Sequence, residues 1–231
     1  MRNLREARPA VKGTRPYDAS KRREQAGRSR DGAIDVAERR FLRDGYANTT
    51  ISAIADDAGI SVDTIYKSFG GKAGLIRAIR ARALRGHGPV AAERRSDNLH
   101  LRERDPREII RGWGALTAEI APRAVPILLL VRDAAATDPE LRTLLEELDS
   151  DRLRRMTDNA RRLHEAGHLR KGLSVDRAAE VLWTYSAPEL YELLVLRRAM
   201  SRDDYGRFVA EAISAAVLEP RRLPPRSRAG R

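Results

Sequence analysis

The chain has 231 residues, of which 42% are hydrophobic, and a formal net charge of +12 at pH 7. This length and apolar content suffice for the packed core of one large domain or two small ones, and they predict a globular protein. The absence of cysteine excludes disulfides, thiolate metal sites and cysteine nucleophiles, and it fits a reducing cytosol.

The positive charge is concentrated at the two ends of the chain. Residues 1–30 contain ten Lys or Arg and three acids, and residues 219–231 contain five and one, so the remainder is nearly neutral. We expect residues 1–26 and 219–231 to be basic disordered tails. Such tails bind polyanions by releasing counterions, without reading sequence. A solvated tail without a partner explains the same composition.

No segment is expected to bind or cross a membrane. The longest apolar run, residues 124–131, is far shorter than the roughly 20 residues that a membrane-spanning helix needs. The first 30 residues lack the apolar core of a signal peptide, and an Arg-rich organellar transit peptide is a minor alternative for them.

Helical periodicity begins after the first tail. A helix is predicted over residues 22–44, followed by Gly45 as a stop. Thr50 is suited to cap a second helix that reaches Ala58. The apolar face of the first helix consists of Ala33, Ile34, Ala37 and Phe41, and that of the second of Ile51, Ile54, Ala55 and Ala58.

A short third helix must begin almost at once. Gly59 favours the left-handed backbone that ends a helix, and Ser61 is a good N-cap, so the third helix is predicted over residues 62–69. Ile65 and Phe69 lie one turn apart on its inner face. After two glycines, a fourth helix is predicted over residues 72–84.

The rest of the chain predicts an all-helical body. Residues 86–105 lose the apolar period and gain Gly, Pro and charge, which indicates a linker or a frayed helix end, and we place a domain boundary there. The head would then cover residues 27–87 and the body residues 88–218. Proline is expected to start helices at Pro122, Pro126 and Pro139, and to kink or split one at Pro188. Helices are expected over residues 106–121, 123–136, 139–166, 175–198 and 202–218, with no strand, so the predicted fold class is all-α.

The second and third helices have the spacing of a helix-turn-helix, with Gly59 in the turn. An ordinary helical hairpin has the same spacing. The stretch from Phe41 to Leu75, FLRDGYANTTISAIADDAGISVDTIYKSFGGKAGL, resembles the DNA-binding head of the TetR (tetracycline repressor) family of bacterial regulators. The resemblance covers residues 27–87. The body resembles the family in its helical plan and in segments such as RLHEAGHLRKGLS and VLWTYSAPELYELLV.

The resemblance implies that the third helix enters the major groove of double-stranded DNA. Thr50 and Ser61 would contact phosphate from helix N-termini, and Lys72 would add a phosphate contact that is independent of sequence. Asp63 departs from expectation, because a carboxylate is unfavourable beside phosphates unless it accepts from a cytosine amino group or turns toward a basic neighbour. The residues expected in or beside the groove are Val62, Asp63, Thr64, Tyr66 and Lys67.

The resemblance also implies a homodimer joined through residues 175–198 and 202–218. The apolar candidates for that interface are Leu182, Leu190, Leu193, Leu194, Phe208, Ile213 and Val217, some of which must serve the protomer's own core. The candidates for an effector pocket are Trp113, Leu116, Ile120, Ile127, Leu128, Trp183 and Tyr185, although any single one is more often plain core.

The expected function is therefore sequence-specific regulation of transcription in the bacterial cytoplasm, without a cofactor. The resemblance implies a repressor that leaves a palindromic operator when a small molecule fills the body. A ligand-independent activator or DNA binder is the near alternative. The rival from another class is a zinc metalloenzyme, because His164, Glu165 and His168 in HEAGH fit the zinc-protease pattern HExxH. That pattern needs one continuous helix, and Gly167 instead indicates a helix end.

Overall fold

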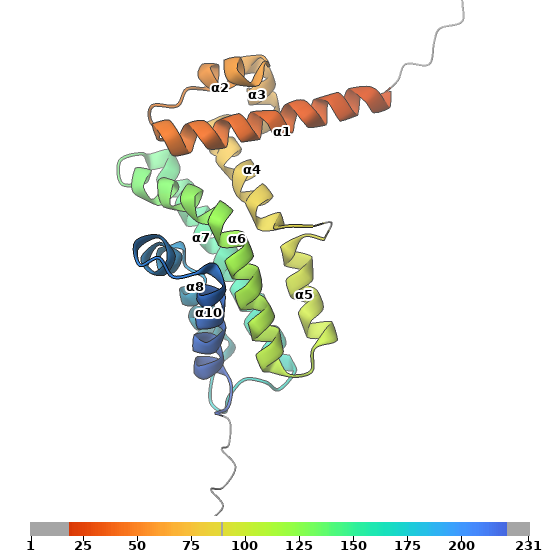
Figure 1. Cartoon of the computed structure of the whole chain (residues 1–231), viewed down its shortest axis with the longest axis vertical. Helices are drawn as coiled ribbons and strands as arrows, with labels where there is room; N and C mark the ends of the chain where they lie inside the picture. The colour runs from red at the N-terminus through yellow and green to blue at the C-terminus, as the bar shows by residue number, and fades with distance from the viewer. Residues whose placement is uncertain (1–18, 89, 221–231) are drawn as a thin grey trace, which may run out of the picture.

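The computed structural model describes residues 19–88 and 90–220, which form helices joined by short loops (Figure 1). In the head these are α1 Ala19–Asp44, α2 Ile51–Ala58, α3 Val62–Phe69 and α4 Lys72–Arg85. In the body they are α5 Ala92–Arg102, α6 Pro106–Ala134, α7 Pro139–Glu165, α8 Val175–Tyr185, α9 Pro188–Tyr191, the π-helix η1 Glu192–Arg197 and α10 Arg202–Val217. Within this part of the chain, strand-like pairing is limited to an isolated bridge between Leu169 and Leu218. The all-α prediction is confirmed.

The expected basic tails lie largely outside the described residues. Residues 19–26, which we assigned to the first tail, belong to α1, so that helix begins earlier than residue 22. Residues 1–18 and 221–231 are not described.

The head follows the capping signals of the sequence. The Thr50 hydroxyl accepts a hydrogen bond from the Ala53 amide at 3.1 Å and caps α2, and the Ser61 hydroxyl accepts from the Thr64 amide at 3.1 Å and caps α3. Between the two helices Gly59 has a φ of 65°, a left-handed backbone conformation that residues other than glycine adopt at a cost in energy. These three residues fix the angle between α2 and α3.

The central body helix differs from our prediction. We expected new helices to start at Pro122 and Pro126, but α6 runs unbroken from Pro106 to Ala134 through both prolines. An interior proline costs roughly 3 kcal/mol, and α6 offsets this by packing against α4, α5, α7 and α10. By length and composition α6 could cross a membrane, yet ten of its residues are buried against these neighbours, as in the core helix of a folded domain. Pro139 does start a helix, as predicted.

Of two further segments, one departs from expectation and the other follows it. The expected linker contains the helix α5, which packs on α6 through Ala92, Ser96 and Leu99. The segment 175–198 is divided as Pro188 predicted, into α8, α9 and η1.

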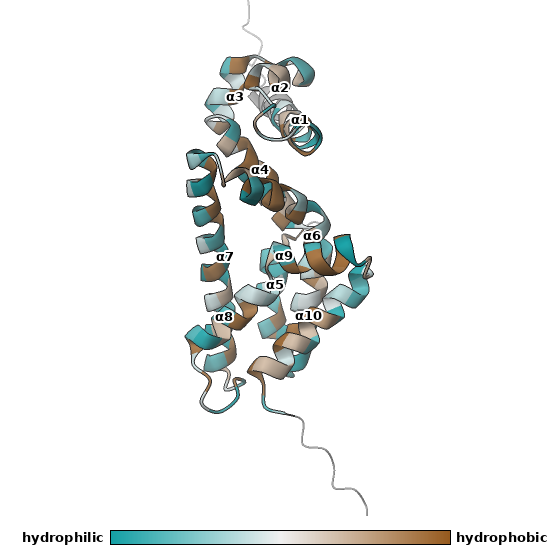
Figure 2. Ribbon diagram, turned by 90° about the vertical axis from the view of Figure 1, so that its left-hand side faces the viewer, coloured by the Kyte–Doolittle hydropathy of each residue, from teal (hydrophilic) through white to brown (hydrophobic). Residues whose placement is uncertain are grey.

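The buried residues form two cores, one above the other. The upper core joins the inner faces of α1 to α4 to the end of α6, at Ile127 and Val131, and to the first turns of α7. The lower core joins α6, α7, α8 and α10. Figure 2 shows hydrophobic residues concentrated along α4, where the head meets the body. Because the upper core is shared, the head is packed on the body through α4.

Candidate DNA-binding surface and ligand cavity

The outer face of α3 lies at one end of the molecule, away from the body (Figure 1). Ile65 is fully buried against the head, whereas Val62, Asp63, Thr64, Tyr66 and Lys67 are exposed. Tyr66 is 54% exposed, which is unusual for a tyrosine that has no ligand to bind. The structure thus brings all five predicted groove residues onto one surface.

The carboxylate of Asp63 turns toward a basic neighbour. Its Oδ2 lies 2.7 Å from the Lys67 Nζ, one helical turn away, and both side chains are largely exposed. This pairing is one of the two arrangements that make an acid tolerable near phosphates. It also keeps Lys67 close to the first turn of the helix.

The amino group of Lys72 is already held by the protein. Its Nζ donates to the Tyr46 carbonyl oxygen at 2.6 Å and lies 3.9 Å from the centre of the Tyr46 ring. Burial lowers the pKa of Lys72. An ammonium carries three donors, so the bond to Tyr46 leaves two for a phosphate. Lys72 therefore ties the start of α4 to the α1–α2 loop in addition to any DNA contact.

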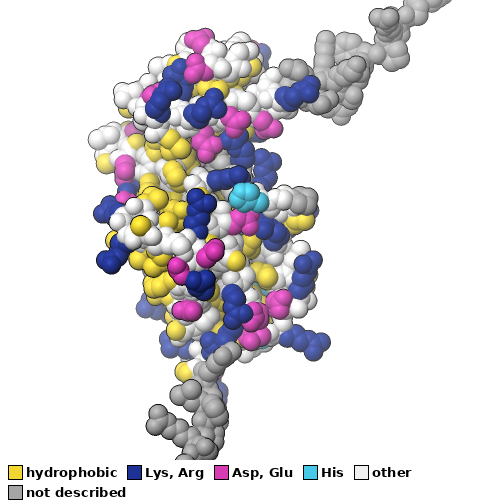
Figure 3. All heavy atoms as spheres, in the orientation of Figure 1, with side chains coloured by type: hydrophobic (Ala, Val, Ile, Leu, Met, Phe, Trp, Pro, Cys, Tyr) yellow, Lys and Arg dark blue, Asp and Glu magenta, His cyan; other side chains and the backbone are white. Residues whose placement is uncertain are grey.

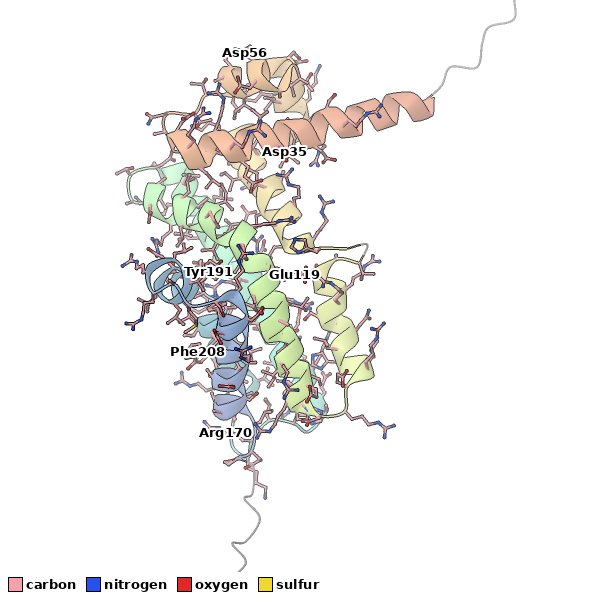
Figure 4. The ribbon with its side chains drawn as sticks, viewed as in Figure 1. Asp35, Asp56, Glu119, Arg170, Tyr191 and Phe208 are labelled. Atoms are coloured by element: carbon pink, nitrogen blue, oxygen red, sulfur yellow. The ribbon has the colours of Figure 1, made fainter. Side chains whose placement is uncertain are left out.

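The α2–α3 unit is itself acidic. It contains Asp56, Asp57 and Asp63 but a single base, Lys67. The Arg40 Nε on α1 donates to the Asp57 carboxylate at 2.7 Å, and this hydrogen bond lowers the pKa of Asp57. Figure 4 shows Asp56 at the tip of the head, farthest from the body. Attraction to a polyanion must therefore come from basic residues outside this unit.

Helix α4 links the head to the body by ion pairs as well as by packing. Arg82 donates to Asp35 and Glu38 of α1, both at 2.5 Å. On α7, Glu147 accepts from Arg77 at 2.6 Å and Asp151 accepts from Arg80 at 3.1 Å. A displacement of α7 would consequently be passed to α4 and to the head.

A partly open cavity of about 800 Å³ lies between α4, α5, α6, α7, α8, α9 and α10. Drug-sized ligands occupy cavities of this order. Of the predicted pocket residues, Trp113, Leu116, Ile120, Leu128 and Trp183 line it. The other two do not. Ile127 is fully buried in the upper core, and Tyr185 packs edge-on against Phe208, with ring centroids 6.5 Å apart.

Sequence reasoning missed the polar residues of the cavity, among them Asn159 and Arg152. Asn159 is 3% exposed, and its Oδ1 has no hydrogen-bond partner among the described residues. The Arg152 guanidinium lies 4.3 Å from the centre of the Trp183 ring and donates to the Trp183 carbonyl. Asn159 continues the buried stripe of α7 beside Ala160 and Leu163, and a polar residue in such a stripe was the available signal.

The predicted dimer residues divide into two groups. Leu182, Ile213 and Val217 are buried in the protomer's own lower core, so they are unavailable to a partner. Leu193 and Phe208 are exposed, and Leu190 and Leu194 are half-buried. Sequence reasoning overlooked Leu196, which is also exposed. Figure 3 shows apolar side chains gathered on this side of the body.

The HEAGH segment does not form a zinc site. Helix α7 ends at Glu165, and Gly167 has a φ of 70°, so His164 and His168 do not lie on one continuous helix. The His168 amide donates to the Leu163 carbonyl at 2.8 Å in a helix-ending turn. No group of three or more potential metal ligands occurs among residues 19–88 and 90–220. The residues described thus give the zinc metalloenzyme alternative no support.

The comparisons with known proteins agree with this geometry. Residues 33–79 match the family model described as "Bacterial regulatory proteins, tetR family". Over 89 residues, 38% of the chain, the sequence is 34% identical to the "Probable HTH-type transcriptional regulator ArpR" of Pseudomonas putida, and the match spans 40% of that regulator's length.

Solved structures extend the likeness through the body. The fold is similar to that of NalD, described as the secondary repressor of the MexAB-OprM multidrug efflux pump in Pseudomonas aeruginosa. The TM-score is 0.67 at 17% identity, over 86% of this chain and 100% of that one. It is also similar to SmeT in a complex with triclosan, with a TM-score of 0.63 at 24% identity, over 85% of this chain and 99% of that one.

Proposed function

The chain carries the DNA-binding domain of the TetR family, and from this premise we propose that the whole protein is a transcriptional repressor. It would bind a palindromic operator as a homodimer, in the cytoplasm, and leave the operator when a small molecule enters the cavity of the body. The observation that carries the proposal is the exposed face of α3, which has the five exposed side chains described above at one end of the molecule. The helix that presents them is capped at both ends, by Ser61 and by Gly70.

Geometry supports the reading of sequence by α3. The helix has only eight residues, so a few side chains near its N-terminus can reach base edges while the capped end presents amides to phosphate. Thr64 Oγ1 lies 2.8 Å from Ser61 Oγ, so these two hydroxyls form one polar group beside the helix start. Tyr66 and Val62 supply the apolar contact that a thymine methyl group needs.

Release of the operator requires a ligand site that is coupled to the head, and the body has a cavity in a suitable position. Its cavity is lined in part by α4 and α7, the helices that are joined by the Arg77–Glu147 and Arg80–Asp151 pairs. A ligand that favours one separation of these helices would shift the spacing of the two heads of a dimer. The related fold of SmeT was solved with triclosan bound, which shows that one protein of this fold takes a small molecule.

The exposed residues Leu193, Leu196 and Phe208 are our candidates for the dimer surface. They lie together on η1 and α10, at the end of the chain where the family resemblance also implies the interface. A two-fold axis through this surface would place two copies of α3 for two half-sites of DNA.

The proposal is tested by selecting duplexes from a random pool with the wild-type protein and with Tyr66→Ala. We expect the wild type to enrich one palindromic sequence. Tyr66→Ala should bind that sequence about tenfold more weakly, since a lost base contact costs about 1–3 kcal/mol. Leu101→Ala, at an exposed position of α5, is the control and should bind as the wild type does. Enrichment of no sequence by the wild type would overturn the proposal.

A further inference from the structure

We infer that the cavity of the body takes an uncharged, largely apolar ligand with an aromatic ring and a hydroxyl group. This inference rests on the proposed function in one respect, namely that the ligand acts as the effector. The ligand's chemical class is argued from the cavity wall alone.

The first observation is a set of buried polar atoms without hydrogen-bond partners among residues 19–88 and 90–220. There are five, of which the Arg95 Nε and the His100 Nε2 belong to residues outside the cavity wall. The other three are the Asn159 Oδ1, the Trp113 Nε1 and the Trp183 Nε1, and all three residues line the cavity. Asn159 is 3% exposed and Trp113 is 6% exposed, so water outside the protein does not reach these groups. Leaving a buried donor or acceptor unsatisfied costs about 1–3 kcal/mol. The atoms have almost no accessible surface, toward the cavity included, so a ligand would reach them by small rotations of the side chains. Three such residues in one cavity wall point to a molecule that satisfies them in this way.

The unpartnered atoms define the polar groups of that molecule. An indole N–H only donates and an amide oxygen only accepts, so the ligand must offer both an acceptor and a donor. A hydroxyl group offers both in one place. The Asn159 side chain comes from α7, Trp113 from α6 and Trp183 from α8, so the polar contacts surround the cavity on several sides.

The charged residues of the wall exclude an ionised ligand. Five arginines and five acids line the cavity, and each has an ion-pair partner of opposite charge. Even the best buried of these guanidiniums, that of Arg152, donates to Asp149 at 3.1 Å and to two groups of α8 and its C-cap. An ionised ligand would therefore lose its hydration without gaining a free counter-charge.

The remaining wall favours an aromatic ring. The chain contains two tryptophans and both line the cavity, together with Leu116, Ile120 and Leu128. Arg152 covers the Trp183 ring at 4.3 Å and holds it in place. Indole rings pack offset or edge-on against other rings, which contributes about 0.5–1.5 kcal/mol beyond the buried area.

The test uses four probes that share one ring system: 2-naphthol, naphthalene, 2-naphthoate and 2-naphthylmethylammonium. Each is titrated by calorimetry into the full chain at pH 7 without DNA. We expect 2-naphthol to bind about tenfold more tightly than naphthalene, in line with one or two net hydrogen bonds of about 1 kcal/mol each. We expect the anion and the cation to bind more weakly than either. Tightest binding by either ion, or binding by none of the four, would overturn the inference.

Two variants locate the polar contacts. Asn159→Leu keeps the number and branching of the side-chain heavy atoms, and it should remove most of the preference for 2-naphthol over naphthalene. Thr157→Val, on the same helix but outside the cavity wall, is the matched control and should keep that preference. Trp183→Phe removes the N–H while keeping an aromatic ring. If the Asn159→Leu variant fails to fold, the preference for 2-naphthol is measured in the Trp183→Phe variant instead. An unchanged preference in both cavity variants would contradict the assigned contacts.

The two proposals fail separately in this design. Binding of the probes is measured without DNA, so a wrong chemical class appears whether or not the protein is a repressor. Release of the selected duplex by 2-naphthol is then measured on its own. Tight binding of 2-naphthol without release would leave the ligand class standing and would count against the effector role.

Discussion

At the scale of single residues, the junction between α3 and α4 depends on Gly74. A Cβ at this position would lie 1.6 Å from the Phe69 carbonyl oxygen, which belongs to the last residue of α3. Only glycine allows α4 to approach the end of α3 so closely. The sequence showed Gly74 inside a predicted helix, where glycine weakens the helix, and gave no sign of what it contacts. The packing of α4 against α3 supplies the reason.

We predict that Gly74→Ala destabilises the protein by more than about 2 kcal/mol, because backbone must move to admit the methyl group. Gly32→Ala is the matched control, because it lies within α1 and its added Cβ would meet no atom within 4 Å. The control should be neutral or stabilising by about 0.5–1 kcal/mol. Urea unfolding followed by circular dichroism measures both, and equal stabilities would contradict the account of this junction.

Lys72 makes a second prediction at the same scale. Replacing it with Met keeps an unbranched side chain and removes both the donor to the Tyr46 carbonyl and the positive charge over the Tyr46 ring. We expect a loss of about 1 kcal/mol of stability. If Lys72 also contacts phosphate, the affinity of this variant should fall similarly for all duplexes. The slope of log affinity against log salt concentration should then decrease in magnitude by about one. A loss of affinity confined to one sequence would contradict a phosphate contact.

At the scale of elements, the head could be predicted because its signals are local. Thr50, Gly59 and Ser61 act within a few residues of their own positions, so capping rules place α2 and α3 closely. The path of α6 through Pro122 and Pro126 could not be predicted, because helices distant in sequence outweigh the local preference. The same holds for α5, whose polar sequence becomes helical against α6. Cavity and core residues, such as Trp113 and Ile127, look alike in the sequence, and only packing separates them.

The joint between α4, α5 and α6 offers a test at this scale. Glu119 on α6 accepts from Arg95 on α5 at 2.5 and 2.8 Å and from the His87 amide at 2.5 Å, and Figure 4 shows it on the α5 side of α6. The hydrogen bonds from Arg95 lower the pKa of Glu119 from 4.5 to about 2. Because the folded-state pKa is depressed, the stabilisation is present above pH 4.5 and is lost as the pH falls toward 2.

We therefore expect Glu119→Gln to be less stable than the wild type by about 2 kcal/mol at pH 7. The gap should narrow steadily below pH 4.5, since the Glu119 carboxyl group of the unfolded wild-type chain takes up a proton there while that of the folded chain stays ionised. Thermal unfolding from pH 7 to pH 3 measures the gap. Glu165→Gln, at the exposed end of α7, serves as the control and should follow the wild type at every pH. A gap of constant size would show that the charge of Glu119 is not what stabilises the joint.

At the scale of the whole molecule, the proposed repressor function requires a dimer, which we place on η1 and α10. Leu193 is 50% exposed, Leu196 is 55% exposed and Phe208 is 39% exposed, on adjoining elements. Exposed apolar side chains of this size, grouped on one surface, are typical of an interface. Not all the residues that we predicted for the interface are accessible to a partner. Ile213 and Val217 face the protomer's own core.

The double variant Leu193→Asp, Leu196→Asp should be monomeric at concentrations where the wild type is dimeric, because two charges would be buried without partners. Sedimentation velocity measures the change. Leu153→Asp, at a comparably exposed position on α7, should leave the assembly intact. A wild-type chain that sediments as a monomer at high concentration would contradict the proposed interface.

The most direct test of the central claim is binding to the DNA upstream of the protein's own gene, titrated by fluorescence anisotropy beside a shuffled duplex at several salt concentrations. We expect saturable binding at least about a thousandfold tighter than to the shuffled duplex. This ratio should persist while both affinities fall with salt. Weak and equal binding to the two duplexes, disappearing at high salt, would show that only basic segments contact DNA and that α3 does not read sequence.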